Sequence, residues 1–465
     1  MRPAWSHNLG RHLTPVCLAI SIEGALMRKR PFLAIVVLHF ALCVGACEPG
    51  GEAELVPTHP PQGNHFVSPS GSDAAAGTEQ QPWRTLQFAA NRLQPGDVLL
   101  VEDGIYRENV VLTCAGTGDE PITILARNFG AAIVDAGGKS ACFSDRGTGL
   151  SHVVIGGLVV RNANRGFDLA GPVTKLKLTD CEITDCSNAF LCRQGADLSL
   201  ERVSVIDCRD GVGLGVKGTS GIEGVTIADC SALLSSEEEG EENTDGFRIE
   251  GLCTDVHITD CEAAGFDDSG FDVKPAGALI QRCLAHHNWD NGFKVWGDGA
   301  RLVNCIARDN DDTGVKFPGA AEMYFCTIAF NRRAAFRPQA ERIEDIKVYN
   351  TIFAYNFIRQ YITNGGRGVF TGDYNLYYAE PDELMWKTMD DEALRFTLDE
   401  LREGALPLGE HSVFAAPAFI SVEDRDLRPH AGSPAKGAGT FFPFVGTDFA
   451  GQPRAVTPTI GAWER

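Results

Sequence analysis

Residues 261–273 read CEAAGFDDSGFDV, and the chain repeats this pattern three more times. The repeats are CLAHHNWDNGFKV (283–295), CIARDNDDTGVKF (305–317) and CTIAFNRRAAFRP (326–338). A period near 22 residues, with short apolar runs and no helical spacing of the apolar residues, is typical of a parallel β-helix. We therefore predict that each repeat forms one coil of a solenoid.

Equivalent residues of successive coils stack at the spacing of neighbouring strands, about 4.8 Å. Because successive residues of a strand point to opposite faces, every position in the repeat forms a column that is either inside or outside. We expect an apolar column inside the solenoid, made of Phe271, Phe293, Val315 and Phe336. The residues that follow them, with one from the preceding coil, should form an outer column of Arg248, Asp272, Lys294, Lys316 and Arg337.

Two further columns are predicted to be structural. Five cysteines occupy the same position of successive coils and should act as buried small apolar side chains rather than disulfides: Cys230, Cys261, Cys283, Cys305 and Cys326. Three asparagines should form a ladder of side-chain amides at a turn: Asn288, Asn310 and Asn331. The neighbouring His286 and His287 are expected at the surface, without a catalytic role.

Composition narrows the class of partner. The 465 residues carry a net charge of −21, which disfavours nucleic acid and anionic membrane surfaces as partners. An anionic sugar polymer stays possible because charges beyond roughly 8 Å are screened at physiological salt. Local positive charge would then have to bind it.

The N-terminus has the pattern of an export signal. A basic segment at 27–30, Met-Arg-Lys-Arg, precedes an apolar run at 32–42 that is short for a membrane span. The run ends at a sequence that resembles a bacterial lipobox, with Cys47 as the lipidated residue. We therefore interpret 1–47 as an upstream segment plus lipoprotein signal peptide, and 48–64 as a flexible tether. This predicts an outer-membrane or cell-surface lipoprotein, or a secreted protein after ordinary signal cleavage. Membrane contact would be only through the lipid, and the protein is expected to be a monomer.

The segment 65–108 resembles the start of secreted bacterial right-handed β-helix proteins, in its V-S-P-S-G-S-D, P-W-R-T-L-Q and G-I-Y-R-E motifs. It includes an expected short amphipathic helix over Thr85–Leu93 that could cover the open end of a solenoid. The closing stretch 415–465 resembles the terminal coils and cap of the same proteins, and we assign 373–465 to the C-terminal coils and cap. The resemblance implies an all-β fold, a single-stranded right-handed parallel β-helix over 65–465 with an N-terminal helical cap.

Three acidic residues are predicted to converge from adjacent coils. Asp245 directly precedes the glycine of its coil, whereas Asp268 and Asp272 flank the glycine of the next. Carboxylates this close need a cation or a protonated member. Calcium suits such a cluster because it prefers oxygen ligands. Lys294 should emerge one coil further, directly over Asp272.

This constellation resembles the family 9 polysaccharide lyases, which are calcium-dependent pectate lyases. Their pattern is an Asp-Gly-Phe coil, then Asp-Asp-Gly-x-Asp, then Asn-Gly-Phe-Lys with the lysine as base. By that resemblance Asp245, Asp268 and Asp272 would bind Ca²⁺, and Lys294 would be the base. Ser269 departs from the pattern, because the family has a fourth calcium-binding aspartate there.

The resemblance implies β-elimination from an acidic polysaccharide, polygalacturonate or a related uronate polymer. Calcium would hold the uronate carboxylate and draw charge from it. A neutral Lys294 would take the C5 proton, although a free lysine is protonated at neutral pH. Further residues are expected to bind substrate, three by charge and the last by stacking on a sugar ring: Arg248, Lys316, Arg337 and Trp296.

Two other functions stay open. Residues 243–246 and Asp267-Asp268 also resemble the Asn-Thr-Asp and Asp-Asp motifs of the polygalacturonases, family 28 glycoside hydrolases. The Gly-His-Gly and Arg-Ile-Lys motifs of that family are missing from this sequence. The alternative from another class is a non-catalytic surface β-helix that binds glycan, because a fold does not settle a function.

Overall fold

The computed structural model describes residues 62–464, except 216–220, 236–243, 251, 340–342, 357–360, 364–369, 381–383 and 389–394. The lipidation site predicted at Cys47, the segment 1–47 and most of the tether lie outside the described residues. Export and lipidation therefore stay predictions. No helix among the described residues is long and apolar enough to cross a membrane.

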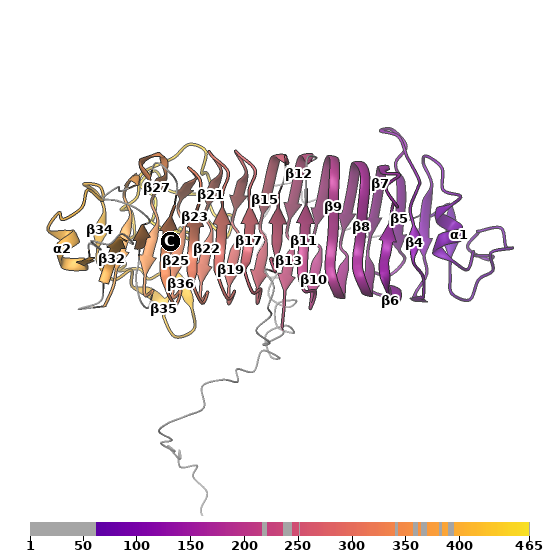
Figure 1. Ribbon diagram of the computed structural model, residues 1–465, viewed down its shortest axis with the longest axis horizontal. Helices are drawn as coiled ribbons and strands as arrows, with labels where there is room; N and C mark the ends of the chain where they lie inside the picture. The colour runs from indigo at the N-terminus through magenta and orange to yellow at the C-terminus, as the bar shows by residue number, and fades with distance from the viewer. Residues whose placement is uncertain are drawn as a thin grey trace, which may run out of the picture. The chain divides into compact units, whose positions relative to one another are not determined.

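Parallel strands wind into a solenoid with three faces, and its coils follow one another from the N-terminal helix to the yellow end in Figure 1. The first face consists of β1 (His65–Val67), β2 (Val98–Val101), β5 (Ile122–Ala126), β7 (Leu150–Gly156), β12 (Ile222–Ala228), β15 (Thr254–Thr259), β18 (Leu279–Gln281), β21 (Arg301–Val303), β24 (Glu322–Tyr324), β27 (Lys347–Tyr349) and β30 (Thr371–Asp373). The second face consists of β3 (Gly104–Tyr106), β10 (Ser204–Ile206), β13 (Ser231–Leu233), β16 (Glu262–Ala264), β19 (Leu284–His286), β22 (Ile306–Arg308), β25 (Thr327–Ala329), β28 (Ile352–Ala354), β31 (Leu376–Tyr378) and β34 (Val413–Phe414).

The third face carries the candidate site. It consists of β4 (Val110–Val111), β11 (Asp210–Leu214), β14 (Phe247–Ile249), β17 (Ser269–Val273), β20 (Asn291–Val295), β23 (Thr313–Phe317), β26 (Ala334–Pro338), β29 (Tyr361–Thr363), β32 (Leu384–Thr388) and β33 (Arg395–Thr397), the last pair antiparallel. Three long strands bend through more than one face: β6 (Ala132–Ser144), β8 (Leu158–Thr179) and β9 (Glu182–Glu201). The predicted parallel β-helix is confirmed.

Aromatic side chains stacked along the interior hold the third face in register. The rings of Phe247, Phe271 and Phe293 are fully buried, and each centroid lies 4.9 Å from the next. Val315 and Phe336 continue the column without exposure, so the predicted inner column is confirmed. Offset stacking adds to the apolar area that each ring removes from water.

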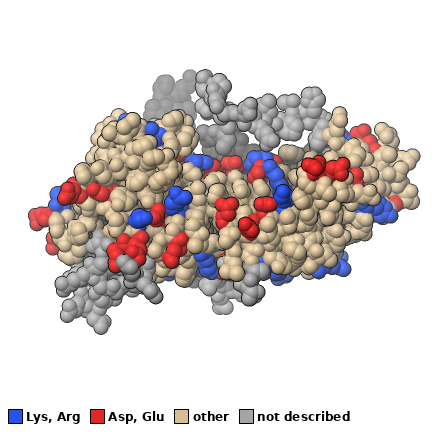
Figure 2. All heavy atoms as spheres, turned by 90° about the horizontal axis from the view of Figure 1, so that it is seen from above, with Lys and Arg blue, Asp and Glu red and all other residues tan. Residues whose placement is uncertain are grey.

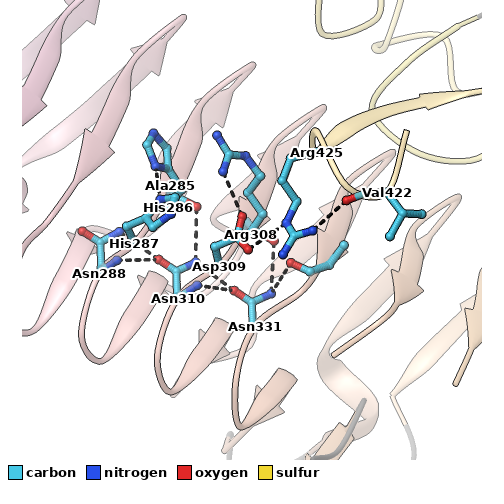
Figure 3. Close-up of polar contacts among 12 residues, drawn as sticks. Ala285, His286, His287, Asn288, Arg308, Asp309, Asn310, Asn331, Val422 and Arg425 are labelled. Carbon is cyan, nitrogen blue, oxygen red and sulfur yellow. Dashed lines mark hydrogen bonds and ion pairs between the residues drawn. The ribbon is translucent and has the colours of Figure 1, made fainter. Parts of the chain in front are cut away.

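The cysteine column and the asparagine ladder are both confirmed. All twelve cysteines of the described residues are buried and free of disulfides, and burial raises the pKa of thiols such as Cys305. The side-chain amide of Asn288 donates to Asn310 at 2.9 Å, and Asn310 donates to Asn331 at the same distance (Figure 3). Asn356, which the sequence reasoning missed, extends this ladder by one coil.

The two ends of the solenoid differ from each other. At the N-terminal end, α1 (Leu86–Ala90) buries Leu86 and Ala89 and is capped by Thr85, so the predicted helix is present but shorter. The C-terminal part contains the 3₁₀ helix η3 (Ile343–Asp345), the short helix α2 (Leu398–Arg402), and a hairpin of β35 (Phe419–Ser421) and β36 (Asp426–Pro429).

Only part of the segment 373–465 continues the coils. After β34 the chain runs back along the solenoid, where Arg425 contacts Asp309 at 2.9 Å and Arg454 contacts Asn304 at 2.7 Å. The backbone amide of Ala462 donates to Thr327 at 3.1 Å. The last fifty residues therefore form a strap over earlier coils, which the local pattern of the sequence does not reveal.

Candidate active site

The outer column predicted from the repeats is present on the third face. Strand pairing places Arg248 beside Asp272, Asp272 beside Lys294, Lys294 beside Lys316, and Lys316 beside Arg337. The regular hydrogen bonding of parallel strands fixes these neighbours one strand spacing apart. A rigid surface therefore carries one acid among four bases, in a chain with an acidic overall charge.

Lys294 is paired with Asp268 on the preceding coil. Its ammonium lies 3.1 Å from Oδ2 of Asp268, and both side chains are more than four-fifths buried. Burial alone would lower the pKa of Lys294, but the charges of Asp272 and Asp268 outweigh it and raise the pKa. Burial likewise works to raise the pKa of Asp268, and Lys294 with the Ser269 hydroxyl lowers it instead. The neutral Lys294 expected from the sequence is therefore not the form that this pair favours.

Asp272 is held by two side chains. Its Oδ1 accepts a hydrogen bond from the indole of Trp296 at 2.8 Å, and its Oδ2 lies 3.3 Å from the ammonium of Lys274. Lys274 also forms an ion pair with Glu250. Burial raises the pKa of Asp272, although Lys294 and Lys274 work against the shift. From the sequence Lys274 is only an alternative base to Lys294, and its ion pair with Asp272 was not predicted, although its position two residues after Asp272 on the same strand face was the available signal.

Trp296 stays partly open to solvent despite this contact. The residue is 41% exposed, and the ammonium groups of Lys294 and Lys274 lie 5.8 and 5.9 Å from its ring centre. An exposed ring beside two cations offers an apolar surface and positive charge together. This combination suits a ring that carries a carboxylate.

Asp245 is the most deeply buried acid of the group. Only 3% of the residue is exposed, and burial, together with the charges of Asp272 and Asp268, raises the pKa of Asp245 to about 8. Its Oδ1 accepts from the backbone amide of Ser269 at 3.2 Å, while the Ser269 hydroxyl donates to Asp268 at 2.8 Å. The three predicted carboxylates therefore do interact, and Ser269 links two of them.

The donor chemistry of these aspartates fits a hard cation, because close, buried carboxylates repel one another. The arrangement is not a ready cage, however: within the described residues no three acidic, histidine or cysteine side chains are gathered closely enough to hold a metal ion. Asp268 and Asp272 are instead neutralised by Lys294 and Lys274. A cation that binds here would have to replace these ammonium groups.

A second acidic column runs beside the bases. Asp312 forms an ion pair with Arg337 at 3.1 Å, which leaves Arg337 only 12% exposed in its side chain. Burial and Asp312 raise the pKa of Asp290 to about 7, and the nearby charge of Lys316 partly opposes this shift. Of the predicted substrate-binding residues, Arg337 is therefore engaged within the protein, whereas Lys316 lies close enough to Asp290 to oppose this shift.

His286 differs from expectation. It is mostly buried on the second face, where its Nε2 lies 2.7 Å from Glu262 and its Nδ1 lies 2.7 Å from His287. Figure 3 shows this pair beside the asparagine ladder. The histidines are thus on another face of the solenoid than Lys294. Elsewhere, acidic and basic side chains are interspersed over the surface drawn in Figure 2.

Comparison with known proteins agrees with this geometry. The family model described as "Pel9A-like, right handed beta helix region" matches residues 65–340, more than half of the chain and all of the candidate site. The predicted right-handed winding is thereby confirmed. Among solved structures, one titled "The complex structure of XylC with xylose" has a TM-score of 0.58 at 12% identity, and covers 86% of this chain and 98% of that one. This likeness shows the fold alone.

Two curated proteins match parts of the chain. "Uncharacterized protein YwoF" of Bacillus subtilis is 33% identical over 88 residues, which are 19% of this chain and 18% of that protein. "Pectate lyase PEL9" of Emericella nidulans is 24% identical over 184 residues, 39% of this chain and 42% of that protein. The matches therefore span less than half of either relative. The family match is the broader finding, and the chain belongs to the Pel9A-like right-handed β-helix family.

Proposed function

We propose that the protein is a polysaccharide lyase that cleaves a uronate polymer by β-elimination, with pectate as the first choice of substrate. The observation that carries the proposal is the position of Lys294, which lies beside Asp272 in the outer column and forms an ion pair with Asp268. The partly exposed ring of Trp296 lies next to it. The similarity to a protein named pectate lyase supports this choice of substrate.

In this mechanism Lys294 removes the C5 proton of the uronate, whose acidity comes from the adjacent carboxylate. The electrons form a double bond between C4 and C5 as the C4–O bond breaks, and solvent protonates the leaving oxygen. Lys294 accepts a proton only in its neutral form, so its ion pair with Asp268 has to be weakened first. Trp296 would stack on a sugar ring, and Arg248 and Lys316 would attract the polymer's carboxylates.

Calcium is part of the proposal. Asp245, Asp268 and Asp272 would hold the ion, which when bound would neutralise these acids and withdraw charge from the substrate carboxylate. Two features support it: burial and the repulsion of Asp272 and Asp268 raise the pKa of Asp245 to about 8 although Arg248 and Lys294 oppose the shift, and both lysine partners have flexible side chains that can turn away.

An ultraviolet assay tests the proposal directly. Polygalacturonate and alginate are incubated with the purified protein, with calcium and with a chelator, while absorbance of the unsaturated uronate and release of reducing ends are both followed. A lyase produces both signals. Reducing ends without absorbance would show hydrolysis instead, and binding without either product would identify a non-catalytic glycan-binding β-helix.

A further inference from the structure

Ser269 lies in the middle of a buried chain of hydrogen bonds that ends at Lys294. It is the first residue of β17 and is fully buried. Its hydroxyl donates to Oδ1 of Asp268 at 2.8 Å, and its oxygen accepts from the side-chain amide of Asn291 at 3.3 Å. The other oxygen of Asp268, Oδ2, lies 3.1 Å from the ammonium of Lys294. One hydroxyl therefore joins the acid that holds the proposed base to a side chain of the next coil.

The amide of Asn291 fixes the direction in which this hydroxyl donates. A serine hydroxyl has one proton, so it can donate to only one acceptor. On the side of Asn291 its oxygen is occupied by the amide nitrogen, which also donates to Oδ2 of Asp290 at 2.7 Å. Reversing the amide would turn its oxygen toward that carboxylate and would remove both bonds. The serine proton is therefore left for Asp268.

The position of Ser269 in the coil does not by itself require a bonded hydroxyl. Strand pairing places Ser269 beside Asn291, Asn291 beside Thr313, and Thr313 beside Ala334. Thr313 is fully buried, and its hydroxyl has no hydrogen-bond partner among the described residues. Ala334 has no hydroxyl at all. The hydrogen bond of Ser269 is thus particular to the coil that carries Asp268.

We propose that Ser269 is a positioning residue, which holds Asp268 in the orientation that contacts the ammonium of Lys294. The inference rests on the proposed function, because it concerns the base of the same reaction. With Oδ1 of Asp268 bonded to the hydroxyl, Oδ2 is directed at Lys294. Without this bond the carboxylate would be free to rotate about its side-chain torsions, and its contact with the lysine would loosen. Ser269 therefore acts on the base through Asp268.

Competitive acylation of lysines measures how firmly the ammonium of Lys294 is held. The purified protein, without calcium or substrate, is treated briefly with acetic anhydride at one fixed pH, and peptide mass spectrometry follows Lys294 and Lys347. Lys347, a half-exposed lysine of β27 on the first face, is the reference inside each protein. Ser269→Ala removes the hydroxyl and Ser269→Thr restores it. Thr313→Val is the matched control, since it removes the unpaired hydroxyl of the same column.

Ser269→Ala should raise the acylation of Lys294 relative to Lys347 by about fivefold or more, because a hydrogen bond to a charged group is lost. Ser269→Thr should leave this ratio as in the parent, since the column already accepts a threonine at 313, and Thr313→Val should also leave it unchanged. An unchanged ratio in Ser269→Ala would overturn the inference, as would an equal rise in either of the other two variants. If Ser269→Ala does not fold, Ser269→Cys decides by the same ratio, because a thiol is a weak donor.

The lyase assay adds a readout that a purely structural role would not change. In Ser269→Ala the increase of the rate with pH should begin at a lower pH, while KM for polygalacturonate changes by less than about twofold. A changed KM with the same pH dependence would contradict the positioning role.

The two proposals can fail separately. An increased acylation ratio in Ser269→Ala, in a protein that forms no unsaturated product, supports the positioning role and removes the lyase. Lyase activity together with an unchanged ratio in Ser269→Ala leaves the lyase standing and removes the positioning role.

Discussion

The ammonium of Lys294 lies 3.1 Å from the carboxylate of Asp268 on the preceding coil. This diagonal contact makes the proposed base an ammonium ion at rest, held by the same acid that is proposed to bind calcium. Base and metal ligand therefore compete for one carboxylate. Whatever neutralises Asp268 also prepares Lys294 for catalysis.

Lys294→Ala should reduce elimination by roughly a hundredfold to ten-thousandfold, the usual contribution of a general base. Lys294→Arg should not restore it, because a guanidinium stays protonated. The rate of absorbance increase on polygalacturonate measures the loss. Lys347→Ala, which removes a half-exposed lysine from β27, is the control and should keep full activity. Full activity in Lys294→Ala would contradict the assignment.

The rate should increase toward alkaline pH, because Asp272 and Asp268 raise the pKa of Lys294 above its ordinary value and only the neutral amine accepts a proton. Asp268→Asn removes one of these charges, so the pKa of Lys294 should fall. The increase of the rate with pH should then begin at a lower pH. Initial rates from pH 6 to pH 11 test the shift, with magnesium and calcium levels held constant. An unchanged pH dependence of the rate in Asp268→Asn would show that Asp268 does not raise the pKa of the base.

Asp245 should make the fold less stable as the pH rises. Its folded-state pKa of about 8 is above that of an unfolded aspartate, so the folded protein binds the extra proton and the free energy of unfolding falls between about pH 4 and pH 8. Asp245→Asn should flatten this decline. Urea denaturation at several values of pH in this window measures it. Parallel curves for both proteins would show that Asp245 is ionised in the fold.

Calcium should raise the melting temperature by mass action, since a folded-state ligand stabilises the fold. Asp272→Ala should lose most of this increase, and Asp255→Ala on the first face should keep it. Differential scanning calorimetry with calcium, with magnesium and with a chelator gives the comparison. The same calcium response in Asp272→Ala as in the parent would place the ion elsewhere.

Asn310→Ala should lower the free energy of unfolding by about 2 kcal/mol or more, because Asn288 and Asn331 lose buried hydrogen-bond partners at once. Asn91→Ala, at an exposed position bonded to Gln87, should cost far less. Urea denaturation compares the two. Equal costs would mean that the ladder does not contribute to stability.

The columns of the third face were predictable because one period governs them all. Once a coil length near 22 residues is set, strand pairing decides which side chains are neighbours, as it does for Asp272 and Lys294. The diagonal pair of Lys294 with Asp268 was not predictable, since Asp268 lies at the bend before β17 and the direction of its side chain depends on the turn. The predicted position of Lys294 over Asp272 is confirmed, but its ammonium forms its ion pair with Asp268.

The neighbour of Arg248 in the preceding coil was missed for another reason. An insertion between Cys230 and Gly246 interrupts the period, so the coil of Asp210 could not be aligned with the later ones by counting residues. Strand pairing makes this alignment directly, through Gly213 and Arg248. The returning strap was equally hidden, because its contacts join residues more than one hundred positions apart.

That strap changes how the solenoid should respond to force. Coils that touch only their neighbours can peel from an end one at a time. Here Arg425 holds the coil of Asp309 and the amide of Ala462 holds that of Thr327, both well inside the stack. A pull on the C-terminus is therefore taken first by these internal coils, and their hydrogen bonds must shear before the last coil can unwind.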